Sequence, residues 1–158
     1  MGERQACLIF MNLKKSFLLQ LVLAGIGVGA ASAAEDWTTD FSAARKRAAA
    51  EHKKLLLDFT GSDWCAACKQ LERDVFPTED FAAFAKDYIL VRVDYPAHKA
   101  LKEPQKSQNE WLKSEYAIEG FPTVLILDAR NRELGRVVGY APDGPGAYLQ
   151  SLTAAMKP

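Results

Sequence analysis

Cys65 and Cys68 are the side chains in this sequence with the clearest capacity for chemistry. They are separated by Ala66 and Ala67 and follow Trp64. Two thiols three positions apart at the start of a helix can close into a disulfide and open again, which transfers two electrons. This requires that the first sulfur is accessible and easily ionised. The pair therefore predicts a dithiol redox site.

Two other interpretations of the pair are half of a zinc site and a structural disulfide. A structural zinc ion needs four ligands. The remaining cysteine, Cys7, lies in a predicted leader, and His52 and His98 have no metal-ligand spacing to the pair or to each other. A disulfide that closes so short a loop removes little entropy from the unfolded chain. Dithiol exchange is favoured over both, and no metal is expected.

The first 33 residues have the pattern of a signal peptide. Lys14 and Lys15 precede an apolar stretch over residues 17–31, and Ala31-Ser32-Ala33 has the small residues of a cleavage site. The apolar stretch is shorter than a helix that spans a bilayer. The pattern predicts export to the periplasm or another extracytoplasmic compartment. The alternative is that the leader is not cleaved and anchors the protein. We expect no other segment of the chain to contact a membrane.

Met11 is the predicted start, and cleavage after Ala33 would leave residues 34–158 as one domain. The whole sequence has 20 basic and 20 acidic residues. A near-neutral chain without a basic stripe gives no indication of nucleic-acid binding. A monomer is expected.

The remainder of the sequence is expected to form short strands and helices in alternation. The spacing of apolar residues predicts helices over residues 41–52, 65–76, 78–85 and 147–156. A Ser107-x-x-Glu110 capping box predicts the start of a further helix. Apolar runs predict strands over residues 55–59, Tyr88–Asp94, Thr123–Leu127 and Glu133–Val138. This order predicts an α/β three-layer sandwich, with helices on both faces of a mixed sheet of four or five strands.

Two segments of the sequence resemble a known family. They are LLLDFTGSDWCAACK over residues 55–69 and GFPT over residues 120–123. With the element order, they make the chain similar to the thioredoxin superfamily over nearly the whole predicted domain. It looks most similar to exported reductase-type members, such as the C-terminal domain of the thiol:disulfide interchange reductase DsbD and small exported thioredoxin-like proteins. The resemblance implies a thioredoxin-like sandwich and thiol:disulfide oxidoreductase activity.

The resemblance assigns roles to the residues around the cysteine pair. Cys65 matches the nucleophile and Cys68 the resolving cysteine. At a helix N-terminus, unpaired N–H groups and the helix dipole would stabilise a Cys65 thiolate. Trp64 matches a tryptophan that shields the site, although it could also be an ordinary core aromatic residue.

Phe121 and Pro122 match the segment that faces the cysteines in this family. The resemblance implies a cis peptide bond before Pro122, which would place the backbone of Phe121 beside Cys65. An extended substrate could then pair with that backbone as an added strand. The alternative is a trans proline that ends the preceding helix.

Asp58 matches a buried carboxylate that accepts the proton of the resolving cysteine. Burial would raise its pKa and let it act as a base through water. The segment from Asp58 to Cys65 is one residue longer than the usual family pattern. An insertion within the strand would turn Asp58 to the other face of the sheet. Gly61 and Ser62 favour an insertion in the turn instead.

The expected activity is exchange of the dithiol with disulfides of other proteins. Ala66 and Ala67 give the thiolate no charged or imidazole partner, which favours a reductant or a mid-range exchanger over a strong oxidant. A reductant outside the cytoplasm implies a membrane electron-donor reductase as partner. No cofactor is expected beyond the redox-active disulfide. The alternatives are a disulfide oxidase or isomerase, a non-catalytic peptide-binding module, and copper delivery, which the lack of nearby His or Met ligands disfavours.

Overall fold

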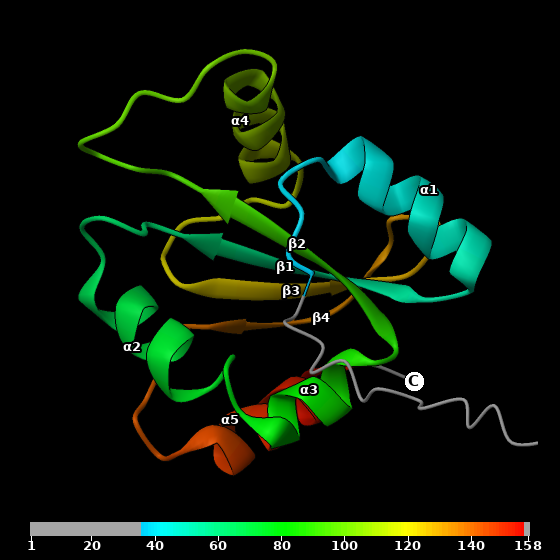
Figure 1. Ribbon diagram of the computed structural model, residues 1–158, viewed down its shortest axis with the longest axis vertical. Helices are drawn as coiled ribbons and strands as arrows, with labels where there is room; N and C mark the ends of the chain where they lie inside the picture. The colour runs from blue at the N-terminus through cyan, green and yellow to red at the C-terminus, as the bar shows by residue number, and fades with distance from the viewer. Residues whose placement is uncertain (1–35, 157–158) are drawn as a thin grey trace, which may run out of the picture. The chain divides into compact units, whose positions relative to one another are not determined.

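A four-stranded mixed sheet lies at the centre of the computed structural model, which describes residues 36–156 (Figure 1). The strand order is β2-β1-β3-β4. β1 pairs in parallel with β2 and antiparallel with β3, and β3 pairs antiparallel with β4. The strands are β1 (Lys54–Thr60), β2 (Tyr88–Asp94), β3 (Thr123–Leu127) and β4 (Glu133–Val138).

Five helices cover the two faces of this sheet (Figure 1). They are α1 (Phe41–Glu51), α2 (Ala66–Asp74), α3 (Glu79–Ala85), α4 (Gln105–Glu115) and α5 (Pro145–Ala155). One buried cluster joins α1 and α4 to the sheet, and a second cluster joins α2, α3 and α5 to the opposite face. The predicted α/β sandwich with a mixed sheet is confirmed.

The two faces of β1 follow from strict alternation along a buried central strand. Leu55, Leu57 and Phe59 belong to the cluster under α1 and α4. Leu56 belongs to the cluster under α2, α3 and α5. Asp58, two positions further on, therefore points to the same face as Leu56.

Side-chain caps start three of the helices where the sequence places polar residues. The Asp40 and Thr78 side chains accept hydrogen bonds from the first turns of α1 and α3, and Cys65 does the same for α2. The predicted capping box at Ser107 is wrong. α4 begins at Gln105, and the Ser107 hydroxyl donates to Glu103 Oε2 at 2.6 Å.

The predicted signal peptide, with its start at Met11 and cleavage after Ala33, lies outside the described residues. The domain boundary at residue 34 stays a prediction. Within residues 36–156, no helix is long and apolar enough to cross a membrane.

Candidate active site

Cys65 and Cys68 form a disulfide at the N-terminus of α2, with their Cα atoms 5.3 Å apart. Cys65 is the N-cap residue, and its Sγ accepts a hydrogen bond from the backbone N–H of Cys68 at 3.2 Å. The first-turn N–H groups and the positive end of the helix dipole therefore face the Cys65 sulfur. Both would stabilise a thiolate there after reduction.

Both cysteines are shielded from solvent when the disulfide is closed. Cys65 is 6% exposed and Cys68 is 3% exposed. The exposed fraction of Cys65 is the larger of the two, as expected for a nucleophile, but the difference in exposure is small. Substrate contact with this site therefore depends on the surface around Cys65.

The turn between β1 and α2 is bound to the end of β2 and to the segment that follows it. Ser62 donates to the Asp94 carboxylate twice, from its backbone N–H at 2.9 Å and from its hydroxyl at 2.6 Å. The Asp63 carboxylate accepts the backbone N–H groups of Ala97 and His98 at 2.8 and 2.7 Å. These bonds fix the backbone that leads into Cys65.

The extra residue between Asp58 and Cys65 lies in this turn. β1 pairs with β2 and β3 without a shift in register at Asp58, which lies opposite Arg92 and Val124. Asp58 therefore keeps the face that α2 covers. Of the two positions considered for the insertion, the strand and the turn, the pairing of β1 therefore favours the turn.

Asp58 is a buried carboxyl group, 3% exposed. Burial raises its pKa to about 7; the positive charge of Arg92 opposes this shift, and Glu72 and Asp94 add to it. Asp58 Oδ1 has no hydrogen-bond partner among the described residues. A carboxyl group with a pKa near neutrality can gain and lose a proton at ordinary pH.

Trp64, the residue before Cys65, is an exposed aromatic residue. Its side chain is 47% exposed, and its indole N–H donates to the carbonyl of Tyr95 at 2.8 Å. The ring packs edge-on against Phe121, with centroids 5.7 Å apart. A Cβ atom at Gly61 would lie 2.4 Å from the Trp64 ring, so only glycine fits beneath it. Trp64 is therefore not an ordinary core residue.

The Phe121–Pro122 peptide bond is cis, the geometry expected from the sequence. Pro122 is buried and Phe121 is half-buried. The carbonyl of Pro122 accepts the backbone N–H of Gly139 at 2.7 Å, which joins the end of β4 to this segment. Phe121 of this segment contacts the ring of Trp64, the residue that precedes Cys65.

In the part of the chain that the structure describes, neither histidine belongs to a group of side chains that could hold a metal ion. His52 is the C-cap of α1, and His98 is exposed in the loop after β2. Within residues 36–156, no three His, Cys, Asp or Glu side chains are grouped so that they could hold a metal ion.

Comparison with known proteins assigns the family. A family model for a thioredoxin-like domain matches residues 41–152. The chain belongs to the thioredoxin-like family. This thioredoxin-like chain is 35% identical to the disulfide bond reductase DsbH of Chlamydia pneumoniae over 108 residues, which cover 68% of this chain and 64% of that protein.

Two further relatives carry related names. The thioredoxin-related protein DsbJ of Chlamydia pneumoniae is 27% identical over 82% of this chain and 41% of that protein. The thiol:disulfide interchange protein DsbD of Actinobacillus pleuropneumoniae is 31% identical over 60% of this chain and 15% of that protein. The thioredoxin-like chain thus spans less than two thirds of the length of each of these three relatives.

Solved structures agree with this family. A structure of a DsbH oxidoreductase matches with a TM-score of 0.69 and 32% identity, over 75% of this chain and 82% of that one. The oxidised C-terminal domain of Neisseria meningitidis DsbD matches with a TM-score of 0.56 and 20% identity, over 75% of this chain and 98% of that one. The second match supports the thioredoxin-like fold alone.

Several residues of the thioredoxin-like site were not found from the sequence. Asp94 and Arg92 lie on β2, and Tyr148 lies on α5. A signal for Asp94 was present, because the C-terminal ends of parallel strands meet at one edge of a sheet, and β2 ends beside β1. Tyr148 had no such signal, since its helical spacing is equally typical of a core residue.

Proposed function

We propose that this protein is a thiol:disulfide oxidoreductase that reduces disulfide bonds of other proteins outside the cytoplasm. The observation that carries the proposal is the Cys65–Cys68 disulfide at the N-terminus of α2. Trp64, which precedes it, packs against Phe121 of the cis Phe121–Pro122 segment. The names of the relatives support the same class of activity. No cofactor is needed, because the dithiol itself holds the two electrons.

In the first step, the Cys65 thiolate attacks a substrate disulfide. A bond forms between Cys65 Sγ and one substrate sulfur, and the other substrate sulfur leaves as a thiolate with the electron pair of the broken bond. The N-terminus of α2 favours the attacking thiolate. Trp64 and Phe121 provide an apolar surface beside the sulfur.

In the second step, Cys68 resolves the mixed disulfide. Its thiol gives a proton to the Asp58 carboxylate, and the Cys68 thiolate then attacks Cys65 Sγ. The Cys65–Cys68 bond forms, and the remaining substrate sulfur leaves as a thiolate. The substrate has gained two electrons, and the enzyme is oxidised. The pKa of Asp58 near 7 suits a group that accepts a proton at neutral pH.

Substrate binding is assigned to the backbone at Phe121. An extended peptide placed along this segment would form main-chain hydrogen bonds as an added strand. The disulfide to be reduced would then lie against Cys65. The exposed ring of Trp64 would cover the other side of the peptide.

The reducing direction rests on the residues between the cysteines. Ala66 and Ala67 provide no cation or imidazole for the thiolate, so the reduced form is not strongly stabilised. A relative named as a disulfide bond reductase supports this direction. A membrane thiol reductase would return the cysteine pair to the dithiol state, and the leader pattern of residues 14–33 supports export of a monomeric protein to such a partner.

The reduction potential and insulin reduction test the proposal. We expect a potential below about −200 mV, closer to that of thioredoxin than to the value of about −120 mV of a strong oxidant. We also expect catalysed reduction of insulin disulfides by dithiothreitol, which Cys65→Ser abolishes. A potential near −120 mV would reverse the direction and favour the oxidase or isomerase alternative.

Trapping in the host identifies the substrate and the electron donor. In Cys68→Ser the second step is blocked, so mixed disulfides at Cys65 should accumulate and can be identified by mass spectrometry. The matched control is Cys65→Ser, which should hold no partner. If the double Cys→Ser variant kept full biological activity, the protein would be a peptide-binding module and not an oxidoreductase.

A further inference from the structure

Two buried oxygen atoms on the α2–α5 side of the sheet have no hydrogen-bond partner among the described residues. They are Asp58 Oδ1 and the Tyr148 hydroxyl. Asp58 is 3% exposed and Tyr148 is 5% exposed. A buried polar group without a partner is costly, so such groups in a native protein usually share a hydrogen bond or an ordered water.

Tyr148 belongs to the same layer as Asp58. It is part of the buried cluster under α2, α3 and α5, together with Leu56 of β1 and Val124 of β3. Leu56 precedes Asp58 on the same face of β1, and Val124 is the residue paired with Asp58 across β3. The charge of Asp58 contributes, after burial, to raising the pKa of Tyr148. The two side chains therefore lie on the same face of the sheet.

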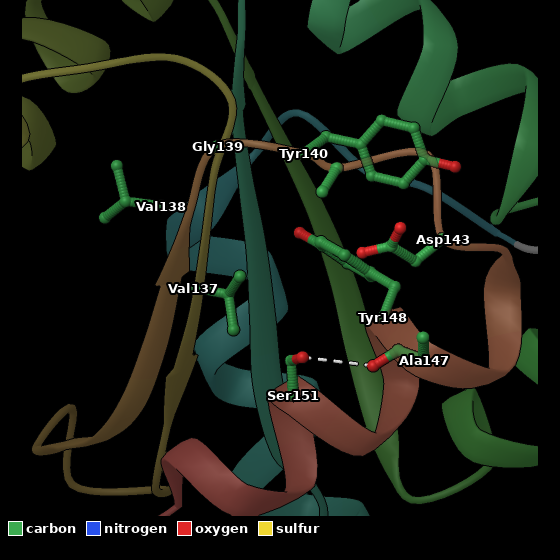
Figure 2. Close-up of a pocket in the computed structure, with 9 residues that line it drawn as sticks. Val137, Val138, Gly139, Tyr140, Asp143, Ala147, Tyr148 and Ser151 are labelled. Atoms are coloured by element: carbon green, nitrogen blue, oxygen red, sulfur yellow. Dashed lines mark hydrogen bonds between the residues drawn. The ribbon is translucent and has the colours of Figure 1, made fainter.

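Tyr148 also lines a pocket of about 390 Å³ between the end of β4 and α5. Val137, Gly139, Asp143 and Ser151 also line it (Figure 2). Figure 2 shows the Tyr148 ring extending from α5 toward the strands, with its hydroxyl at the far end. Tyr148 therefore belongs both to the wall of this pocket and to the buried cluster under α2, α3 and α5.

We propose that Tyr148 is a positioning residue for Asp58, whose carboxylate accepts a hydrogen bond from the Tyr148 hydroxyl through one buried water molecule. The pocket beside Tyr148 is the route by which this water exchanges with solvent. The contribution to turnover rests on the proposed function. After Asp58 takes the proton of Cys68, it releases that proton through the water to the pocket and returns to the carboxylate. No electron pair moves between enzyme and substrate in this step.

Other charged groups also face Asp58 and have to be kept constant in any test. They are Arg92 and Asp94 of β2 and Glu72 of α2. Arg92 forms an ion pair with Glu72 at 2.9 Å. A change at Tyr148 leaves all three in place, so a shift in the titration of Asp58 would report on the tyrosine hydroxyl.

The test is the titration of the Asp58 side chain by carbon-13 NMR in the oxidised protein, where neither cysteine titrates. Tyr148→Phe removes one oxygen and keeps the ring. Since the hydroxyl stabilises the charged carboxylate, its loss should raise the pKa of Asp58 by about half a unit to one unit. The pH dependence of insulin reduction should move to higher pH by the same amount.

Tyr88→Phe is the matched control. Tyr88 is a buried tyrosine of the same cluster, and its hydroxyl bonds to Met156 Sδ at 3.5 Å. It should leave the titration of Asp58 unchanged. An equal titration of Asp58 in wild type and in Tyr148→Phe would overturn the proposal, as would equal shifts in the two variants.

A second measurement does not depend on the folding of Tyr148→Phe. With 3-fluorotyrosine at position 148, the fluorine resonance should titrate with the pKa of Asp58, and Asp58→Asn should abolish that titration. A flat fluorine signal in the first protein would overturn the proposal. Neither titration needs a substrate, so a protein that fails to reduce insulin but shows both shifts would contradict the proposed function alone.

Discussion

At the scale of single residues, Asp58 connects the redox site to the stability of the fold. In the unfolded chain its carboxyl group releases a proton near pH 3.8, whereas burial raises its pKa in the folded state to about 7. Between these values the folded state binds more protons than the unfolded state. The free energy of unfolding should therefore fall as pH rises from about 4 to about 7, and this contribution should be constant at higher pH.

Asp58→Asn should remove this pH dependence. The amide carries no charge, so the variant should gain stability relative to wild type between pH 4.5 and pH 8, by up to about 4 kcal/mol. Urea unfolding of both oxidised proteins at several pH values measures the difference. A difference between the two proteins that is the same at pH 4.5 and pH 8 would show that Asp58 titrates normally.

At the scale of elements, the turn between β1 and α2 depends on bonds that cross to the loop after β2. The Asp63 carboxylate holds two backbone N–H groups, and these bonds lower the pKa of Asp63, with the bond from Ala97 the largest cause. The sequence predicted a turn at Gly61 and Ser62. It could not identify the partners of Ser62 and Asp63, because Asp94 and His98 are distant in sequence and become neighbours only through the pairing of β1 with β2.

Asp63→Ala should loosen this attachment without unfolding the sheet. Amide hydrogen exchange at Ala97 and His98 should accelerate by about tenfold or more, because hydrogen bonds to a charged acceptor are lost. Asp63→Asn keeps one side-chain oxygen as an acceptor and should give an intermediate effect. Unchanged exchange at both amides in Asp63→Ala would mean that the loop is held by other contacts, such as the bond from the Trp64 indole to Tyr95.

Local sequence patterns were sufficient to predict the bounds of three strands. Strand bounds at Tyr88–Asp94, Thr123–Leu127 and Glu133–Val138 were predicted, because β-branched and apolar runs are local signals. The start of α4 was missed, because Ser107 is the third residue of the helix and not its N-cap. Its backbone N–H and its hydroxyl both donate to Glu103 Oε2, so the acceptor for the first turn lies before the helix. The Ser107-x-x-Glu110 pattern therefore does not mark the N-cap here, because Ser107 donates to Glu103, which precedes the helix.

At the scale of the whole molecule, the arrangement of both faces of the sheet could be predicted, and the polar contacts within one face could not. The β-α-β unit and the hairpin specify which strands meet, and alternation along β1 then specifies the face of Asp58. Tyr148 lies on the last helix, and its position near Asp58 depends on how α5 packs over β3 and β4. Such packing is set by side-chain shape across the layer, which no local pattern in the sequence encodes.

The direction of electron flow is also a property of the whole molecule, because the reduction potential and folding stability are linked. The disulfide of a reductant is the favoured state of the folded protein, so the oxidised form should resist unfolding more than the reduced form. Two features agree with this order. The buried acidic group Asp58 disfavours a nearby thiolate, and Ala66 and Ala67 provide no compensating positive charge.

We therefore expect guanidinium unfolding at pH 7 to give a free energy of unfolding for the oxidised protein that exceeds the value for the reduced protein by about 1 kcal/mol or more. For a two-electron couple, about 1.4 kcal/mol corresponds to a difference of about 30 mV between the potentials of the folded and unfolded dithiol. The double Cys→Ser variant is the control, and its stability should not respond to reductant. A reduced form more stable than the oxidised form would assign the protein to the oxidising members of its family, because the fold would then favour the thiolate over the disulfide.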